Sequence, residues 1–221
     1  MGREQLVSHA ARLIDDSLTV GSAGNLSMRL GDVVLITPSG IGCADVRACD
    51  ICVVGLDGAP LDAPLPVSSE TPLHLAIYAA TDARAVVHTH SPEVIALSAV
   101  CDELPAIHYA IAGLGGPVRV ARYRRFGSEG LVQAAVTALK DRRATILQNH
   151  GAICYGASLA EAYDRALLLE WLARVYRLAR SLGTPRILNT AELDDVIAEF
   201  RRIGYGTGRD NQLGSAGGPQ A

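Results

Sequence analysis

Two histidines two positions apart, His88 and His90, follow the hydrophobic run AVV and precede a Ser-Pro pair. Side chains of a β-strand alternate between its two faces, so this spacing places both imidazoles on one face, about 7 Å apart along the backbone. Such a pair is suited to binding one metal ion. It is also common on protein surfaces, and two ligands do not complete a zinc site.

A third histidine, His150, ends a hydrophobic stretch and stands between Asn149 and Gly151. Glycine lets another stretch of backbone approach closely, and functional side chains gather in the loops at strand ends. Together with His88 and His90, His150 completes a three-histidine set that can hold a catalytic zinc with one position left open. Zinc held by neutral imidazoles keeps its full charge and can act as a Lewis acid on a carbonyl oxygen.

Glu70 follows two serines and precedes a predicted helix start, from which its carboxylate can point toward the same pocket. The alternative is that Glu70 only compensates the helix dipole in the first turn. Of the other histidines, His9 and His74 lie on predicted helices and are expected to be surface or packing residues. The sequence leaves the role of His108 open.

Three short segments combine small residues with a hydroxyl or an amide, namely Gly24-Asn25, residues 37–40 and Ser68-Ser69. Each can offer unobstructed backbone N–H groups to an anion, although each is also typical of a simple turn. Beside three histidines, they indicate a small phosphorylated substrate that requires no strong local cation.

Hydrophobic periodicity and capping residues predict the elements that carry these side chains. Thr71 is expected to cap a helix with Pro72 at its first position, and Ser91-Pro92 to start another. Ser158 and Glu161 form an expected capping box at the start of the longest helix. Strands are expected at 32–37, 52–55 and 85–90 and as a pair within 144–156, and helices near 1–16, 71–80, 128–140, 158–182 and 191–203, besides the one that starts at Pro92. This irregular alternation predicts an α/β class with one sheet covered by helices.

The composition narrows the class of protein. The chain has 221 residues, of which 49% are hydrophobic and 19% charged, with a net charge of −3. It lacks the basic blocks that a nucleic-acid-binding surface needs, and no stretch is long and apolar enough to span a membrane. We find no linker, so we expect a single catalytic domain at 1–205 and a flexible, glycine-rich tail at 206–221. The five cysteines are expected to be reduced thiols, which indicates a cytoplasmic protein.

Taken together, these stretches resemble the class II aldolase/adducin family. The matching pieces occur in family order over about residues 5–205: GSAGNLS, ITPSGI, SSETPLH, AVVHTH, LPAIHYAIAGLGG, ATILQNHGAI and the helix after Ser158. No single piece is specific, but the ordered set is. The resemblance implies a three-layer α/β/α fold with a central mixed, largely antiparallel sheet.

The resemblance also assigns roles. His88, His90 and His150 would bind one Zn2+ per chain, and Glu70 would be both a fourth ligand and the acid/base that moves a proton at the donor carbon. Tyr109 would approach from an adjoining subunit of a homotetramer, with the sites at subunit contacts, and protonate the aldehyde oxygen. The phosphate would be bound by Gly24, Asn25, Ser39, Gly40, Ser68 and Ser69.

The expected reaction is reversible cleavage of a ketose 1-phosphate, similar to L-fuculose 1-phosphate, to glycerone phosphate and a small aldehyde such as lactaldehyde. The stretch FRRIGYG places Ile203 or Gly204, with Tyr205 close by, where family aldolases carry a tyrosine that closes over the aldehyde. The aldehyde therefore stays open, and 5-deoxyribulose or methylthioribulose 1-phosphate are alternative substrates. Three further functions are compatible with the same resemblance: a pentulose-phosphate 4-epimerase, a 3-oxo-acid phosphate decarboxylase and a non-catalytic adducin-like scaffold.

Overall fold

A single sheet of nine strands runs through the protein in the order β4-β3-β2-β1-β5-β9-β8-β7-β6. The computed structural model describes residues 2–204, so Tyr205 and the predicted tail at 206–221 lie outside the described residues. Strands β7 and β8 pair in parallel, and the other neighbouring strands pair antiparallel. The strands are Asn25–Leu30 (β1), Val33–Ile36 (β2), Cys52–Gly55 (β3), Pro60–Asp62 (β4), Ala85–Thr89 (β5), Glu103–Leu104 (β6), Val118–Ala121 (β7), Ala144–Leu147 (β8) and Gly151–Gly156 (β9).

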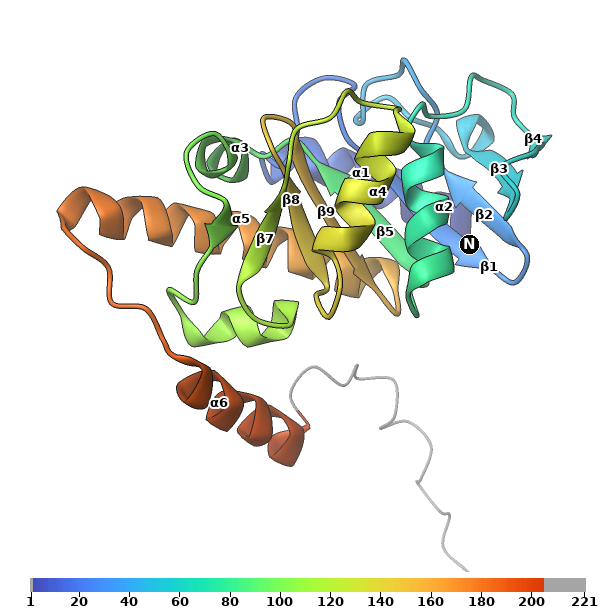
Figure 1. Ribbon diagram of the computed structural model, residues 1–221. Helices are drawn as coiled ribbons and strands as arrows, with labels where there is room; N and C mark the ends of the chain where they lie inside the picture. The colour runs from blue at the N-terminus through green and yellow to red at the C-terminus, as the bar shows by residue number, and fades with distance from the viewer. Residues whose placement is uncertain (1, 205–221) are drawn as a thin grey trace, which may run out of the picture.

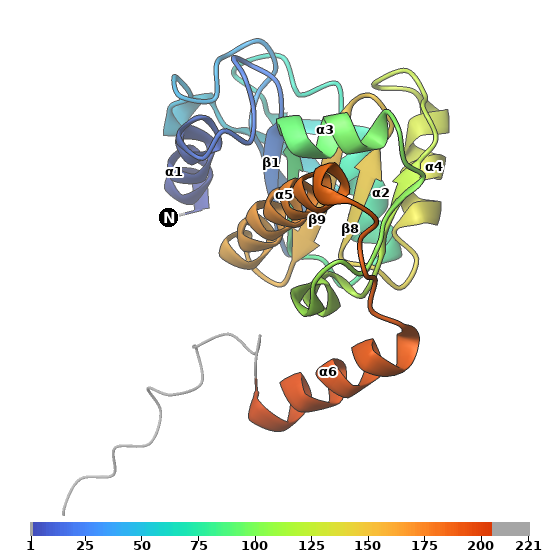
Figure 2. The ribbon, with the colours of Figure 1, turned by 90° about the vertical axis from the view of Figure 1, so that its left-hand side faces the viewer.

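Helices cover both faces of this sheet, as Figures 1 and 2 show. Helices α2 and α4 lie on one face, and α1, α3 and α5 lie on the other. The expected three-layer α/β/α arrangement with a largely antiparallel sheet is confirmed. The helices are Gly2–Asp15 (α1), Thr71–Ala80 (α2), Pro92–Ser98 (α3), Glu129–Ala138 (α4), Leu159–Leu182 (α5) and Thr190–Ile203 (α6), with short 3-10 turns at Ala48–Asp50 (η1) and Tyr109–Leu114 (η2).

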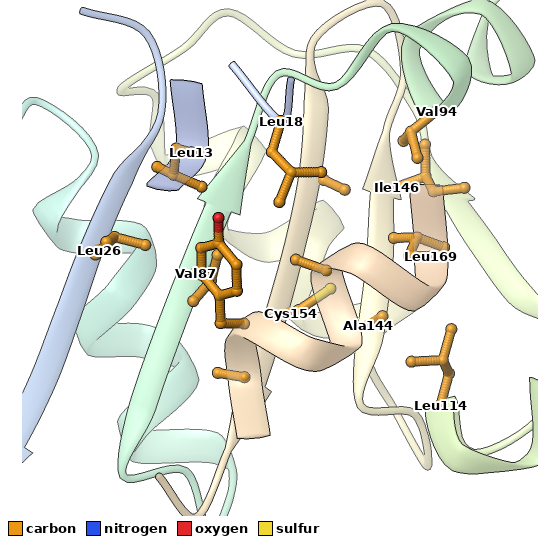
Figure 3. Close-up of a cluster of buried hydrophobic side chains, with 14 of the residues drawn as sticks. Leu13, Leu18, Leu26, Val87, Val94, Leu114, Ala144, Ile146, Cys154 and Leu169 are labelled. Carbon is orange, nitrogen blue, oxygen red and sulfur yellow. The ribbon is translucent and has the colours of Figure 1, made fainter. Parts of the chain in front are cut away.

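Two hydrophobic clusters, one on each side of the sheet, hold the layers together. The larger cluster joins α1, α3 and α5 to the sheet, and Figure 3 shows its centre, where Val87 and Cys154 lie among side chains from these helices. The smaller cluster joins α2 and α4 to the opposite face. Every residue of β5 is buried. Burying each large aliphatic side chain contributes about 1.5–3 kcal/mol, so the histidine-bearing strand is held firmly from both faces.

The element boundaries differ from the expected ones at a few points. Residues 25–30 form β1, which the pattern around Gly24 did not predict, because its alternation is broken by polar side chains that face the site. Thr71 is the first residue of α2 and does not cap it, since Glu70 occupies the cap position. Ser158 caps α5 as expected, but Glu161 accepts a hydrogen bond from the backbone of Ala157 instead of closing the box.

Helix α6 stands away from the layered body and contacts it mainly through η2 (Figures 1 and 2). Within residues 2–204, none of the helices combines the length and the apolar character that crossing a membrane requires.

Candidate metal centre

Glu70, His88, His90 and His150 converge although the chain separates them widely. One nitrogen or carboxylate oxygen from each residue lies within 4.8 Å of the corresponding atom of every other. Glu70 Oε2 lies 2.9 Å from His88 Nε2, and Glu70 Oε1 lies 3.3 Å from His150 Nε2. His90 Nε2 lies 2.9 Å from His88 Nε2. The structure therefore brings all four predicted ligands to one point.

The sheet and its connections set these positions. His88 lies on β5, and the backbone N–H of His90, one residue past the strand, donates to Leu18 O at 2.9 Å. His150 lies in the turn between β8 and β9, where Ser98 of α3 accepts a hydrogen bond from the backbone of Asn149. Asn149 adopts a left-handed conformation with φ of 54°, which asparagine tolerates better than most residues.

Gly151 makes the approach of the two histidine-bearing segments possible. A Cβ at this position would lie 2.0 Å from the carbonyl oxygen of Thr89, far inside contact distance. Only glycine allows β9 to pass this close to the end of β5, as the sequence led us to expect.

The orientation of the His88 ring leaves one nitrogen for a metal ion. His88 Nδ1 lies 2.9 Å from the carbonyl oxygen of Ala152, an acceptor only, so Nδ1 carries a proton and donates. The opposite nitrogen, Nε2, therefore faces the cluster. A ligand histidine commonly donates its other N–H to a carbonyl in this way.

Burial and mutual charge set the protonation of the cluster. Burial alone would raise the pKa of Glu70, but the charge of His88 and hydrogen bonds from His88 and Asn25 lower it well below its usual range. Burial lowers the pKa of His90 to about 3 and that of His150 to about 4, and the charge of His88 adds to both effects. His90 and His150 are therefore neutral near pH 7, the form that binds metals.

The residues fit a divalent metal ion. Glu70 Oε1 is buried and has no hydrogen-bond partner among the described residues, because its approach to His150 lacks hydrogen-bond geometry. A buried carboxylate oxygen without a partner is costly, and an ion bound there would satisfy it. Three imidazole nitrogens and one carboxylate oxygen are a typical zinc donor set.

A second group of buried polar side chains lies behind Glu70. Asn25 Nδ2 donates to Glu70 Oε2 at 2.9 Å, and His74 Nε2 lies 2.6 Å from Asn25 Oδ1. His74 is fully buried and hydrogen-bonded at both ring nitrogens. It is thus more than the surface or packing residue that its helical position indicated.

An open hollow of about 310 Å3 adjoins the cluster. Five of the six predicted phosphate-binding residues line it, and Gly40, which follows Ser39 in a turn, does not. Ser39 N donates to Pro66 O at 2.9 Å, which ties the 37–40 turn to the segment leading to Ser68. The five residues are Gly24, Asn25, Ser39, Ser68 and Ser69.

The hollow is also lined by residues that the sequence analysis did not predict to lie there. Tyr123, Arg124 and Phe126 from the loop after β7 line it, as does Asn149. Arg124 places a cation beside the hydroxyl-rich wall, where the sequence indicated that none was required. The cluster RYRRF at 122–126 was the available signal, since three arginines and two aromatics in five residues are unusual beside a small-residue turn.

Tyr109 does not line this hollow. It lies on η2 with 52% of its surface exposed, and its ring packs near His108 and Phe200. Of the other histidines, His9 is half-buried and packs edge-on against the Tyr163 ring, and His108 caps η2 by accepting from Ala110 N.

Comparison with known proteins places these features in context. Residues 4–177 match the family described as "Class II Aldolase and Adducin N-terminal domain". The chain is 36% identical to 5-deoxy-D-ribulose 1-phosphate aldolase of Bacillus thuringiensis serovar kurstaki, over 92% of this chain and 96% of that protein. It is 37% identical to 5-methylthioribulose-1-phosphate/5-deoxyribulose-1-phosphate aldolase of Rhodospirillum rubrum, over 91% and 92% of the two chains. A solved structure of L-fuculose 1-phosphate aldolase superposes with a TM-score of 0.88 at 32% identity, covering 90% of this chain and 96% of that one.

Proposed function

The chain belongs to the class II aldolase and adducin family, and we propose that it is a zinc-dependent aldolase that cleaves a ketose 1-phosphate reversibly. The products are glycerone phosphate and a small aldehyde. The observation that carries this proposal is the convergence of Glu70 with three histidines beside a hollow lined by serine hydroxyls and the Asn25 amide.

His88, His90, His150 and Glu70 would hold the ion, one per chain, through the atoms that face the cluster. When bound, zinc supplies a Lewis acid for the oxygens beside the bond that breaks. The hydroxyls of Ser39, Ser68 and Ser69 bind the phosphate together with the Asn25 amide and the backbone at Gly24, whereas Gly40, which does not line the hollow, shapes the turn that carries Ser39. Arg124 adds a charge-assisted contact from the facing loop.

Glu70 moves the proton at the donor carbon. Its carboxylate is buried, reaches the cluster and contacts no cationic side chain other than the histidines among the described residues. Once away from His88 and His150, the carboxylate loses the contacts that lower its pKa while burial still raises it, so it can accept or return a proton, which contributes about 10²- to 10⁴-fold in rate.

Tyr109 protonates the aldehyde oxygen from a neighbouring copy. Its half-exposed ring lies outside the hollow of its own chain, which fits action on another subunit of a homotetramer. Mixing a Tyr109→Phe chain with a Glu70→Gln chain tests this directly. Hybrid oligomers should regain activity that neither parent shows, and activity that stays at the level of the parents would show that Tyr109 does not act on the site of a neighbouring copy.

Two substrate classes are equally supported. L-Fuculose 1-phosphate would release lactaldehyde, whereas 5-deoxyribulose or methylthioribulose 1-phosphate would release an aldehyde without the hydroxyl group. Tyr123 and Phe126 line the hollow and would be available to contact the aldehyde half of either substrate. A phosphorylated sugar as substrate fits the cytoplasmic location that the sequence indicated.

The decisive experiment combines metal analysis with aldol synthesis. Purified protein should contain close to one zinc per chain, and His90→Ala should lose it. Glycerone phosphate is then offered with lactaldehyde, glycolaldehyde, acetaldehyde and a methylthio-aldehyde, and the product identifies the substrate class. Stoichiometric zinc in His90→Ala, or no condensation with any aldehyde by the zinc-loaded wild type, would refute the proposal. A 4-epimerase would instead interconvert pentulose phosphates, and a scaffold protein would bind no metal.

A further inference from the structure

A continuous path of buried side chains leads from Tyr78, in the last turn of helix α2, to the Glu70 carboxylate. Tyr78 Oη lies 2.7 Å from Ser27 Oγ, and Ser27 Oγ lies 2.7 Å from His74 Nδ1. His74 Nε2 lies 2.6 Å from Asn25 Oδ1, and Asn25 Nδ2 lies 2.9 Å from Glu70 Oε2. All five side chains are at most 7% exposed.

The ionised Glu70 carboxylate at one end of the path fixes the direction of every hydrogen bond. An ionised carboxylate only accepts, so the Asn25 amide must turn its NH2 group toward Glu70 and its oxygen toward His74. That oxygen also only accepts, so His74 Nε2 must carry a proton. In a neutral ring Nδ1 then accepts from the Ser27 hydroxyl, and Ser27 accepts from Tyr78. Each group donates toward Glu70.

Burial makes the neutral ring the stable form. His74 is completely enclosed, and among the described residues its ring nitrogens contact only Ser27 Oγ and Asn25 Oδ1, so burial favours the uncharged form. The backbone reinforces the arrangement, because His74 is one helical turn after Glu70 and its N–H donates to Glu70 O at 3.2 Å.

We propose that His74 is a positioning residue which, as the neutral Nε2–H tautomer, holds the Asn25 amide in the one orientation that donates to Glu70. Its catalytic consequence rests on the proposed function of Glu70, whereas its tautomer and the Asn25 orientation do not. An inverted amide would place Asn25 Oδ1 against the carboxylate and leave the His74 N–H without an acceptor. Hydrogen bonds of this kind behind a metal ligand typically change affinity or activity about 10- to 100-fold.

The orientation also defines what Asn25 offers to a ligand. The amide has two N–H groups, and the bond to Glu70 uses one. Asn25 lines the hollow, so its second N–H remains available to a substrate oxygen. His74 would thereby keep the hollow a donor surface, suited to phosphate and hydroxyl oxygens, although it does not itself line it.

Two substitutions of nearly identical shape isolate the hydrogen bond. His74→Gln can place an amide N–H near the position of Nε2, whereas His74→Met fills similar space with no donor. We expect kcat to fall about 10- to 100-fold in His74→Met and to stay within a few-fold of wild type in His74→Gln. Equal losses in the two variants, at equal thermal stability, would overturn the proposal.

A spectroscopic measurement on the metal-free wild type provides the independent readout. With 15N-labelled histidine, the His74 ring should show a protonated Nε2 and an unprotonated Nδ1 at pH 7. The Asn25 side-chain NH2 signals should be preserved in His74→Gln and shifted in His74→Met. A His74 ring protonated at Nδ1 would refute the inference whether or not the enzyme turns over. An inactive protein with the expected tautomer would refute the proposed function alone. Should His74→Met fail to fold, Ser27→Ala replaces it: the Nε2–H tautomer should persist there, because Asn25 Oδ1 still requires a donor, and a ring that becomes protonated at Nδ1 instead would count against the path.

Discussion

Asn25 and His88 are Cα partners across the antiparallel pair formed by β1 and β5. The register of this strand pair therefore places the candidate metal ligand His88 opposite Asn25, whose amide donates a hydrogen bond to Glu70. A slip of one residue would turn Asn25 to the opposite face of the sheet and remove its bond to the carboxylate. The buried residues Leu26 and Val87, which are also partners, resist such a slip because both belong to the larger core cluster.

Gly151→Ala should damage both the fold and the metal centre. The added Cβ would lie 2.0 Å from Thr89 O and 3.4 Å from His88 Cε1. The Thr89 backbone, which is paired within the sheet, can move away only at a cost in strain. We expect the free energy of unfolding to fall by about 1–3 kcal/mol, with weaker zinc binding because β5 and the His150 turn must separate. Urea unfolding and a zinc competition assay measure the two effects.

Gly113→Ala is the matched control for that variant. Its Cβ would lie 3.8 Å from Leu168 Cδ2, an ordinary contact, and the stability should change by no more than about 0.5 kcal/mol. If Gly151→Ala were as stable as Gly113→Ala, the close approach of β9 to β5 would not hold in solution.

Much of the fold could be predicted because its signals are local. Pro92 and Ser128 mark helix starts that the structure contains, and the break at 149–151 correctly separates β8 from β9. Strand β1 was missed, since Ser27 and Asn25 point polar groups inward, and hydrophobic alternation cannot distinguish a buried hydroxyl with a partner from an exposed one. Whether such a hydroxyl is buried depends on tertiary contacts, which the hydrophobic pattern of the sequence does not contain.

The candidate site could likewise be predicted only in part. His88 and His90 could be paired by spacing alone, but His150 was joined to them by its chemistry and by resemblance. Arg124 and His74 were overlooked for a physical reason. Arg124 reaches the hollow through a loop whose path local sequence does not determine, and the burial of His74 depends on β1 lying against α2.

Glu70→Gln should bind metal but lose most turnover. Glutamine keeps an oxygen ligand of similar size and can still accept from Asn25 Nδ2, yet it cannot carry the proton. We expect kcat to fall by about 10²- to 10⁴-fold, with the zinc content close to that of wild type. Single-turnover cleavage and elemental analysis of the same sample separate the effects, and full activity would remove Glu70 from the proton transfer.

Arg124→Ala should weaken substrate binding more than turnover. Arg124 lines the hollow with Ser68 and Ser69, and its guanidinium donates a local hydrogen bond to Tyr123 O at 2.9 Å. A partly exposed contact to phosphate is worth about 1–1.4 kcal/mol, so KM should rise roughly 5- to 10-fold. Arg125→Ala removes the neighbouring exposed arginine, which does not line the hollow, and equal KM values in the two variants would count against a specific role.

The pH dependence of stability should report the burial of His74. Its folded pKa of about 3 lies below the usual value of 6.5, so the unfolded chain binds the proton first as the pH falls. Its stabilising contribution is thus complete above pH 6.5 and is lost toward pH 3. Between pH 7 and 5.5 metal-free wild type should lose about 1 kcal/mol more than His74→Gln. Glu70 contributes little in this window, because carboxylates in an unfolded chain titrate near pH 4.5. Urea unfolding at both pH values measures this difference. Equal losses of unfolding free energy in the two proteins would show that His74 is not held neutral.

Glu170→Ala should loosen the metal centre from a distance. Helix α3 begins directly after His90 and Ser91, yet the Ser91 hydroxyl makes no cap hydrogen bond. Both carboxylate oxygens of Glu170 on α5 instead accept the first free backbone N–H groups of α3, from Glu93 at 3.0 Å and from Val94 at 3.1 Å.

Removing that carboxylate leaves the helix dipole and two N–H groups uncompensated, which should lower the unfolding free energy by about 1–2 kcal/mol. The matched control is Glu199→Ala, which breaks only an exposed pair with Arg202 and should cost at most about 0.5 kcal/mol. Because the start of α3 fixes the chain just past His90, Glu170→Ala should also release zinc faster to a chelator than the control does. Equal release rates would show that β5 and the Leu18 contact hold His90 without help from α3.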